Sequence, residues 1–135
     1  MKRWMILGLC LIFTGCATLI ETRPQPDQKE LTRVDQVHLG MGRQQVESLM
    51  EDHVNIGYQM KDETKTSYEP VILKNPVRSE EIKSEDKTYQ VLYYFTQIKN
   101  PDGIMAEEEL TPLVFEADKL VSKDWDFVFK LKNKR

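Results

Sequence analysis

The side chains best suited to chemistry are the two histidines, His38 and His53, which lie fifteen residues apart. Neither has a cysteine partner, and the pair lacks the His-Glu-x-x-His spacing of a helical zinc site. A metal or catalytic site requires several ligands directed at one point. We therefore expect two ordinary histidines, at the surface or at helix ends.

Carboxylates form a second candidate group. Glu107, Glu108 and Glu109 together with Asp102 could bind a hard cation. Calcium prefers oxygen ligands at alternating positions around a glycine-enabled bend, and three consecutive glutamates do not supply that spacing. A solvated hairpin loop that protects a sheet edge from pairing is the favoured interpretation.

Catalytic motifs are missing from the chain. Asp124 and Asp126 would project from one face of a strand, which could suit acid–base catalysis, but nothing near them in the sequence indicates a pocket. The sequence has no Gly-x-Ser-x-Gly elbow and no phosphate-binding glycine loop. We predict a protein that is not an enzyme and that has no metal or cofactor.

The N-terminus has the features of an export signal. Met1-Lys2-Arg3 is a short positive start, and Trp4 to Phe13 is an apolar run. The run has about half of the ~20 residues needed to span a bilayer, and its length and flanks are those of a signal peptide. The alternative is a buried N-terminal helix, which is disfavoured because a polar stretch containing prolines follows.

The end of this segment resembles the cleavage box of bacterial prolipoproteins, in which a small residue precedes a cysteine. Phe13-Thr14-Gly15-Cys16 fits that pattern, with Phe where Leu is usual, whereas bulky Leu9 precedes Cys10. The resemblance implies cleavage between Gly15 and Cys16, a diacylglycerol thioether on Cys16 and N-acylation by a fatty acid such as palmitate. Several acyl chains together give a stable membrane anchor.

Two further expectations follow from this anchor. Ala17 stands where, in lipoproteins of the enteric type, an Asp favours retention in the inner membrane. The resemblance therefore implies the outer membrane, with the domain facing the periplasm. Because Cys10 would leave with the signal peptide and Cys16 would carry lipid, the mature chain would have no thiol for a disulfide or a metal site.

Charge narrows the choice of partners. Loss of Lys2 and Arg3 with the signal peptide changes the formal net charge from −3 to −5. A negative domain is unsuited to binding nucleic acid, which requires a basic face, and it would not bind anionic lipid by charge alone.

The 135 residues suit a single domain. We divide the chain into a signal peptide (1–15), a lipidated tether (16–30, about 20 Å as a coil), a domain (31–131) and a basic tail (132–135).

The first half of the domain shows helical periodicity and then an irregular region. Leu31 to Leu39 has near-helical apolar spacing that ends at Gly40, and Gly42 is a suitable N-cap for a second helix at about 43–52, with Gln45 completing part of a capping box. The region 53–86 is interpreted as an irregular insertion. It contains candidate edge strands at 56–60 and 68–73, and a charged turn or loop at 79–87.

The C-terminal third has the pattern of antiparallel strands. Residues 89–98 predict a central strand, 100–103 a turn, 110–115 a second strand and 116–119 a tight turn. Residues 120–131 predict a third strand, whose inward side would carry Val121, Trp125, Phe127, Phe129 and Leu131. The expected fold is α+β, with two short N-terminal helices packed on a three-stranded antiparallel sheet (ααβββ).

Two segments resemble known small lipoproteins. Leu39-Gly40-Met41-Gly42-Arg43-Gln44-Gln45-Val46 is similar to the opening of the second helix in the BamE (SmpA/OmlA) family, with Gly42 in place of a Ser or Thr cap. The strands at 89–94, 110–115 and 120–121 resemble uncharacterised lipoproteins that share this fold. The BamE family belongs to the machine that inserts β-barrel proteins into the outer membrane, so the resemblance implies a barrel-assembly component as one partner.

Aromatic residues supply the candidate contact surface. Tyr93 and Tyr94 lie on the expected central strand and Trp125 on the third, and on an exposed face they would be interface anchors. The alternative is that the helices cover one face and the insertion the other. We expect a lipid-anchored, non-enzymatic protein-binding module of the envelope. The alternative function is an envelope-stress lipoprotein that binds a small molecule or a cell-wall fragment in an apolar pocket.

Overall fold

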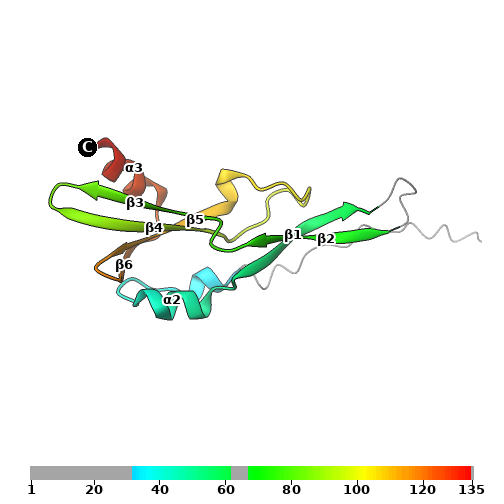
Figure 1. The fold of residues 1–135 in the computed structure, drawn as a ribbon, viewed down its shortest axis with the longest axis horizontal. Coiled ribbons are helices and arrows are strands. Elements are labelled where there is room, and N and C mark those ends of the chain that lie inside the picture. Colours follow the sequence, from blue (N-terminus) through cyan, green and yellow to red (C-terminus); the bar gives the residue numbers. More distant parts are fainter. Residues whose placement is uncertain (1–31, 62–66, 135) are drawn as a thin grey trace, which may run out of the picture.

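A computed structural model describes residues 32–61 and 67–134 (Figure 1). In chain order the elements are the short 3₁₀ helix η1 (Thr32–Gln36), α2 (Arg43–Leu49), β1 (His53–Met60), β2 (Tyr68–Lys74), β3 (Arg78–Ser84), β4 (Lys87–Phe95), the 3₁₀ turn η2 (Glu107–Glu109), β5 (Leu110–Glu116), β6 (Lys119–Ser122) and α3 (Trp125–Asn133).

The centre of the molecule is a four-stranded antiparallel sheet with the order β3-β4-β5-β6. The predicted central strand is confirmed, since β4 lies between β3 and β5. The predicted tight turn is also present. Ala117 and Asp118 both have positive φ angles, 47° and 59°, which is the geometry of a two-residue hairpin whose twist matches its strands.

Both faces of this sheet are covered, which explains why β4 is apolar on both sides. Val91, Tyr93 and Phe95 point into a core closed by α3. Leu92 and Tyr94 point into a second core, closed by η1, α2 and the segment that joins them. Figure 1 shows α3 on one side of the sheet and α2 on the other. The order of layers is therefore helix, sheet, helix.

A separate two-stranded ribbon extends from this body. β1 and β2 pair with each other and form a sheet of their own. In Figure 1 the ribbon projects at the end of the long axis opposite to α3. The side of the ribbon that carries Val54 and Ile56 packs against the same core as α3, so its base is continuous with the body.

The expected ααβββ fold is wrong. The protein has two antiparallel sheets, of two and four strands, in place of one three-stranded sheet. The region 53–86, interpreted as an irregular insertion, supplies three strands. The candidate edge strands at 56–60 and 68–73 lie in β1 and β2. The charged stretch at 79–87, expected to be a turn or loop, contains most of β3. In β3 only one side is buried, at Ile82 and Ser84, so the strand is polar enough to resemble a loop.

The prediction of two N-terminal helices packed on the sheet is corrected as well. α2 forms as expected, and the Gly42 N–H donates to the Gln45 side chain at 2.9 Å. The first expected helix is only the single 3₁₀ segment η1. After it, the backbone of Gly40 and Met41 exchanges hydrogen bonds with Leu120 of β6, at 2.8 and 2.9 Å. This pairing covers the β6 edge of the sheet, and Gly40 turns the chain into it with a φ angle of 86°.

The third expected strand, 120–131, divides into β6 and α3. Asp124 has the extended backbone of an N-cap. Trp125, Val128 and Leu131 then recur every three residues and face the core. Trp125, Phe127, Phe129 and Leu131 also alternate as in a strand, so the segment fitted both periods. The helix places Phe129 outward, where the strand had placed it inward.

Candidate functional site

Two of the three residues expected to form a partner surface are in the core. Tyr93 and Tyr94 are 0% and 1% exposed, on opposite faces of β4. Burial raises the pKa of both hydroxyls, that of Tyr94 to about 12. Neither ring is accessible to a partner protein. The segment from η1 to α2 covers one face of the sheet, whereas the other face, which the alternative assigned to the insertion, is covered by α3 together with the base of the ribbon.

Trp125, the third residue, is only half-buried and begins α3. Its indole N–H donates a 3.1 Å hydrogen bond to the carbonyl of Leu110, at the start of β5. Its ring lies 5.3 Å from the Tyr93 ring on one side and 5.9 Å from the Phe129 ring on the other. The three rings form a continuous stack from the core to the surface.

Phe129 is the exposed end of this stack, with 55% of its surface accessible. Sequence analysis missed it as a surface residue because the expected strand placed it inward. The helical spacing of Trp125, Val128 and Leu131 could have revealed it, since Phe129 lies off that stripe. Phe129 is informative because it continues a stack of aromatic rings from the core, since a single exposed apolar side chain is common on protein surfaces.

Charged groups surround the stack. The Arg78 guanidinium lies 4.1 Å from the centre of the Tyr93 ring, in cation–π geometry, and pairs through both nitrogens with Glu107. The hydrogen bond from Arg78 to Glu107 is the main cause that raises the pKa of Arg78. On the other side, Glu80 accepts hydrogen bonds from the Tyr93 hydroxyl and from Lys132, the latter at 2.7 Å.

Glu80 remains ionised in this environment. Burial raises the pKa of its carboxyl, but the hydrogen bonds from Lys132 and Tyr93 outweigh burial and lower the pKa below its usual value. Because Arg78 and Lys132 both have carboxylate partners, the surroundings of the stack are close to neutral.

These residues line a groove of about 510 Å³ beside α3. Its floor is aromatic and its rim carries two cations and two carboxylates; the lining residues are Arg78, Glu107, Glu108, Trp125, Phe129 and Lys132. An apolar centre with a polar rim is the usual anatomy of a protein–protein contact. We call this surface the α3 groove.

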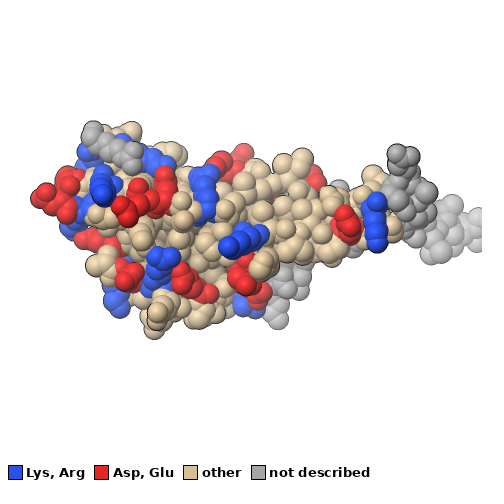
Figure 2. All heavy atoms as spheres, in the orientation of Figure 1, with Lys and Arg blue, Asp and Glu red and all other residues tan. Residues whose placement is uncertain are grey.

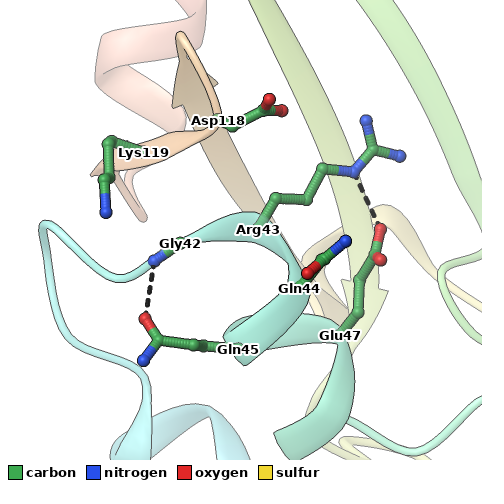
Figure 3. Close-up of a pocket in the computed structure, with 7 residues that line it drawn as sticks. All are labelled: Gly42, Arg43, Gln44, Gln45, Glu47, Asp118 and Lys119. Atoms are coloured by element: carbon green, nitrogen blue, oxygen red, sulfur yellow. Dashed lines mark hydrogen bonds and ion pairs between the residues drawn. The ribbon is translucent and has the colours of Figure 1, made fainter.

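A second hollow, of about 720 Å³, lies where α2 meets the β5–β6 turn (Figure 3). Its lining is polar. The Arg43 Nε atom donates to Glu47 at 2.8 Å, and Gly42 donates to Gln45. The backbone N–H of Arg43 donates to the carbonyl of Asp118 at 2.9 Å. These bonds hold the 40–43 segment against β6, so we interpret this hollow as a structural junction.

The acidic run does not form a cation site. Glu107 pairs with Arg78, and Glu108 pairs with Lys99 at 2.9 Å, which lowers the pKa of Glu108. Glu109 is 1% exposed, and its carboxylate accepts three backbone N–H groups, from Lys99, Ala106 and Asn100, at 2.8, 2.9 and 3.3 Å. The expected solvated loop is therefore wrong for Glu109, which organises the 96–109 loop from within.

The other sequence candidates do not assemble into a site. His38 and His53 are exposed, and His53 lies 3.1 Å from Asp52. Asp124 and Asp126 line a shallow hollow with Lys130, of about 490 Å³, that the sequence had not indicated. Within residues 32–61 and 67–134, no group of His, Cys, Asp and Glu could hold a metal ion.

The residues of the expected anchor, Gly15 and Cys16, lie outside the described residues. So does the fifteen-residue segment that was expected to be a signal peptide. Among the helices that the structure describes, none is long and apolar enough to cross a membrane.

The fold and the groove define a small domain whose four-stranded antiparallel sheet is covered on both faces and whose surface carries an aromatic groove. The chain belongs to the DUF3192 family, a family of proteins of unknown function, which matches residues 20–126. No curated protein matches the chain, and no solved structure matches it. Because the family match begins after Cys16, it has no bearing on the expected lipid anchor.

Proposed function

We propose that this protein is a lipid-anchored component of the bacterial envelope, and that it acts as a non-enzymatic protein-binding module through the α3 groove. The observation that carries the proposal is the exposed Phe129 ring at the end of the stack through Trp125 to Tyr93. Aromatic residues held rigidly at the centre of a surface supply most of the binding energy in protein interfaces.

The shape of the groove favours a protein partner over a small ligand. Pockets for small molecules enclose most of the ligand surface, whereas this groove is shallow and lies along one side of a helix. The Arg78–Glu107 and Lys132–Glu80 pairs leave its rim near neutral. A neutral rim does not attract an anionic ligand. The groove instead suits an apolar side chain of a partner protein, with polar contacts around it at the rim.

The proposed lipid anchor is supported by the cleavage box from Phe13 to Cys16 and by the apolar run before it. Lipid on Cys16 would keep the domain near the outer membrane, where the local concentration of envelope partners is high. A barrel-assembly component is the partner that the resemblance to the BamE family implies. Recruitment and stabilisation of such a partner would be the whole activity.

The test is affinity purification of the C-terminally tagged protein from membranes in mild detergent, followed by mass spectrometry. Phe129→Ala removes the exposed ring, and Lys130→Ala, at an exposed position on the same helix, is the matched control. We expect one envelope protein to be recovered with the parent and with Lys130→Ala, and lost with Phe129→Ala. Equal recovery with Phe129→Ala would overturn the assignment of the groove.

The anchor is tested in the same preparation. Cys16→Ala should leave an unprocessed or mislocalised precursor, because no other cysteine has a small residue before it. If this variant is processed and fractionates like the parent, the lipid anchor is wrong. A preparation of the parent without any bound protein would contradict the binding role and favour the small-ligand alternative.

A further inference from the structure

The β1–β2 ribbon has two chemically different faces near its free end. The face that is continuous with the core carries Val54 and Leu73 at the base and the hydrogen-bonded pair Gln59–Glu69, at 2.6 Å, farther out. The opposite face carries Tyr58, Met60, Tyr68, Pro70 and Ile72. We call this second set of residues the outer ribbon face.

A bulge in β1 creates this arrangement. Asn55 is opposite Ile72 but Gly57 is opposite Val71, so Ile56 is an extra residue in β1. Without it, strict alternation would place Tyr58 and Met60 on the same side as Val54 and the core. The extra residue reverses the alternation and turns both side chains to the outer face.

The outer ribbon face is apolar and accessible. Met60 and Ile72 are 52% and 54% exposed, and Pro70 is exposed beside them. Tyr58 and Tyr68 are half-buried. Exposed apolar side chains that cluster in this way mark an interaction site. Figure 2 shows charges of both signs over the body and fewer on the visible side of the ribbon.

The path of the chain indicates which surface the ribbon meets. Arg33, close to the first described residue, forms a 2.6 Å ion pair with Glu51, which lies just before β1. The first described residues therefore lie near the base of the ribbon. The eight residues of β1 extend about 26 Å at about 3.3 Å per residue, and the tether expected from the sequence spans about 20 Å.

We propose that the outer ribbon face docks on the lipid bilayer that carries the anchor. This inference rests on the lipid anchor in the proposed function. Tyrosine and aliphatic side chains favour the boundary between head groups and acyl chains, and an apolar face of this kind inserts by burial of apolar area and not by charge. A domain of net negative charge requires that mode of attachment.

Docking would give the domain a defined orientation. The ribbon and α3 lie at opposite ends of the long axis (Figure 1). Because the ribbon runs along this axis, contact through its outer face lays the long axis along the membrane and places the α3 groove at the end away from the contact. Lys74, exposed at the ribbon base on the same side as Ile72, would lie at the level of the lipid head groups.

The experiment places a tryptophan at the proposed contact and reads its distance from the acyl chains. Ile72→Trp and the matched control Phe129→Trp are both substitutions at exposed positions, and Trp125 is a background common to both variants and the parent. The processed, lipidated protein, which has lost Trp4 with the signal peptide, is reconstituted in vesicles of phosphatidylethanolamine and phosphatidylglycerol, with or without brominated acyl chains. Flotation of the vesicles reports the anchor separately.

Docking predicts that brominated lipid quenches most of the added fluorescence of Ile72→Trp and that its emission shifts to the blue, while Phe129→Trp shows neither change. A water-like, unquenched Ile72→Trp would overturn the inference, whether or not the protein floats. A blue shift that depends on protein concentration and not on brominated lipid would assign the face to a second copy. Flotation without quenching would contradict the docking alone, whereas failure to float would contradict the anchor and also the docking, because no protein would be held at the bilayer.

Discussion

The ring of Trp125 lies 5.3 Å from the ring of Tyr93 with an angle of 37° between their planes. This contact connects the first turn of α3 to the centre of the sheet, because Tyr93 is fully buried on β4. The indole hydrogen bond to Leu110 fixes the orientation of the ring. A surface contact residue, Phe129, is thereby supported by the rigid part of the fold, which reduces the entropy lost on binding.

Phe129→Ala should separate binding from stability. The side chain is more than half exposed, so its loss should change the free energy of unfolding by less than about 1 kcal/mol. The same change removes the apolar centre of the α3 groove and should reduce partner binding at least tenfold, or about 1.4 kcal/mol. Thermal unfolding and partner recovery measure the two effects, and a large fall in melting temperature would show that the ring is structural.

Trp125→Ala should damage both properties. It removes the half-buried ring between Tyr93 and Phe129 and leaves the Leu110 carbonyl without its donor. We expect a loss of about 2–4 kcal/mol in the free energy of unfolding, from packing and the hydrogen bond together. Chemical denaturation measures the loss. Trp125→Phe keeps the ring without the hydrogen bond and should lose only about 1 kcal/mol.

Glu109→Gln tests the role of the buried carboxylate. Two carboxylate oxygens accept three backbone N–H groups, and the amide of Gln would turn a donor toward at least one of them. The expected loss is about 1–3 kcal/mol. Glu108→Gln, at an exposed position in the same turn, is the matched control and should leave the free energy of unfolding nearly unchanged. Equal stability of the two variants would show that the Glu109 bonds contribute nothing net.

Acid should weaken the environment of the α3 groove through Glu80. Its carboxyl has a lowered pKa in the folded protein. The stabilisation is therefore present above the ordinary glutamate pKa of about 4.3 and is lost as the pH falls through the lower folded-state value. Glu80→Gln should show a smaller drop in melting temperature between neutral and acidic pH than the parent. An identical drop would mean that other carboxylates account for the acid sensitivity.

Elements with one dominant period could be predicted from the sequence. β4 is apolar on both sides because two cores meet it, and its apolar run identified a central strand. The Glu116–Lys119 hairpin and the capped start of α2 depend on local chemistry, which is visible in adjacent residues. These three features need no knowledge of the rest of the chain.

Elements decided by distant contacts were predicted wrongly. Residues 125–131 fit a strand and a helix equally, and Trp125 selects the helix through its packing on Tyr93, a residue far away in sequence. β3 is a polar strand because only Ile82 and Ser84 turn inward. Consequently the α3 groove could not be predicted, since it consists of side chains from β3, η2 and α3.

Substitution of Gly57, which lies in β1, should destabilise the ribbon. A Cβ atom at this position would lie 2.8 Å from the backbone nitrogen of Gly103 and 2.9 Å from its Cα atom. Both contacts are shorter than real Cβ atoms make, and backbone cannot move aside as a flexible side chain can. Gly57→Ala should therefore push the 100–105 loop away from β1, with a loss of about 1–3 kcal/mol in the free energy of unfolding.

Hydrogen exchange can locate this effect. Amides of β1 and of the 100–105 loop should lose protection in Gly57→Ala, while the β3-β4-β5-β6 sheet keeps its protection. Gly42→Ala is the matched control, because a Cβ atom there would meet only the Gln45 side chain, at an ordinary 3.5 Å, and the Lys119 side chain at 4.0 Å. If protection is lost throughout the sheet as well, the ribbon and the body unfold together. That coupling would act through Val54 and Ile56, which belong to the core under α3.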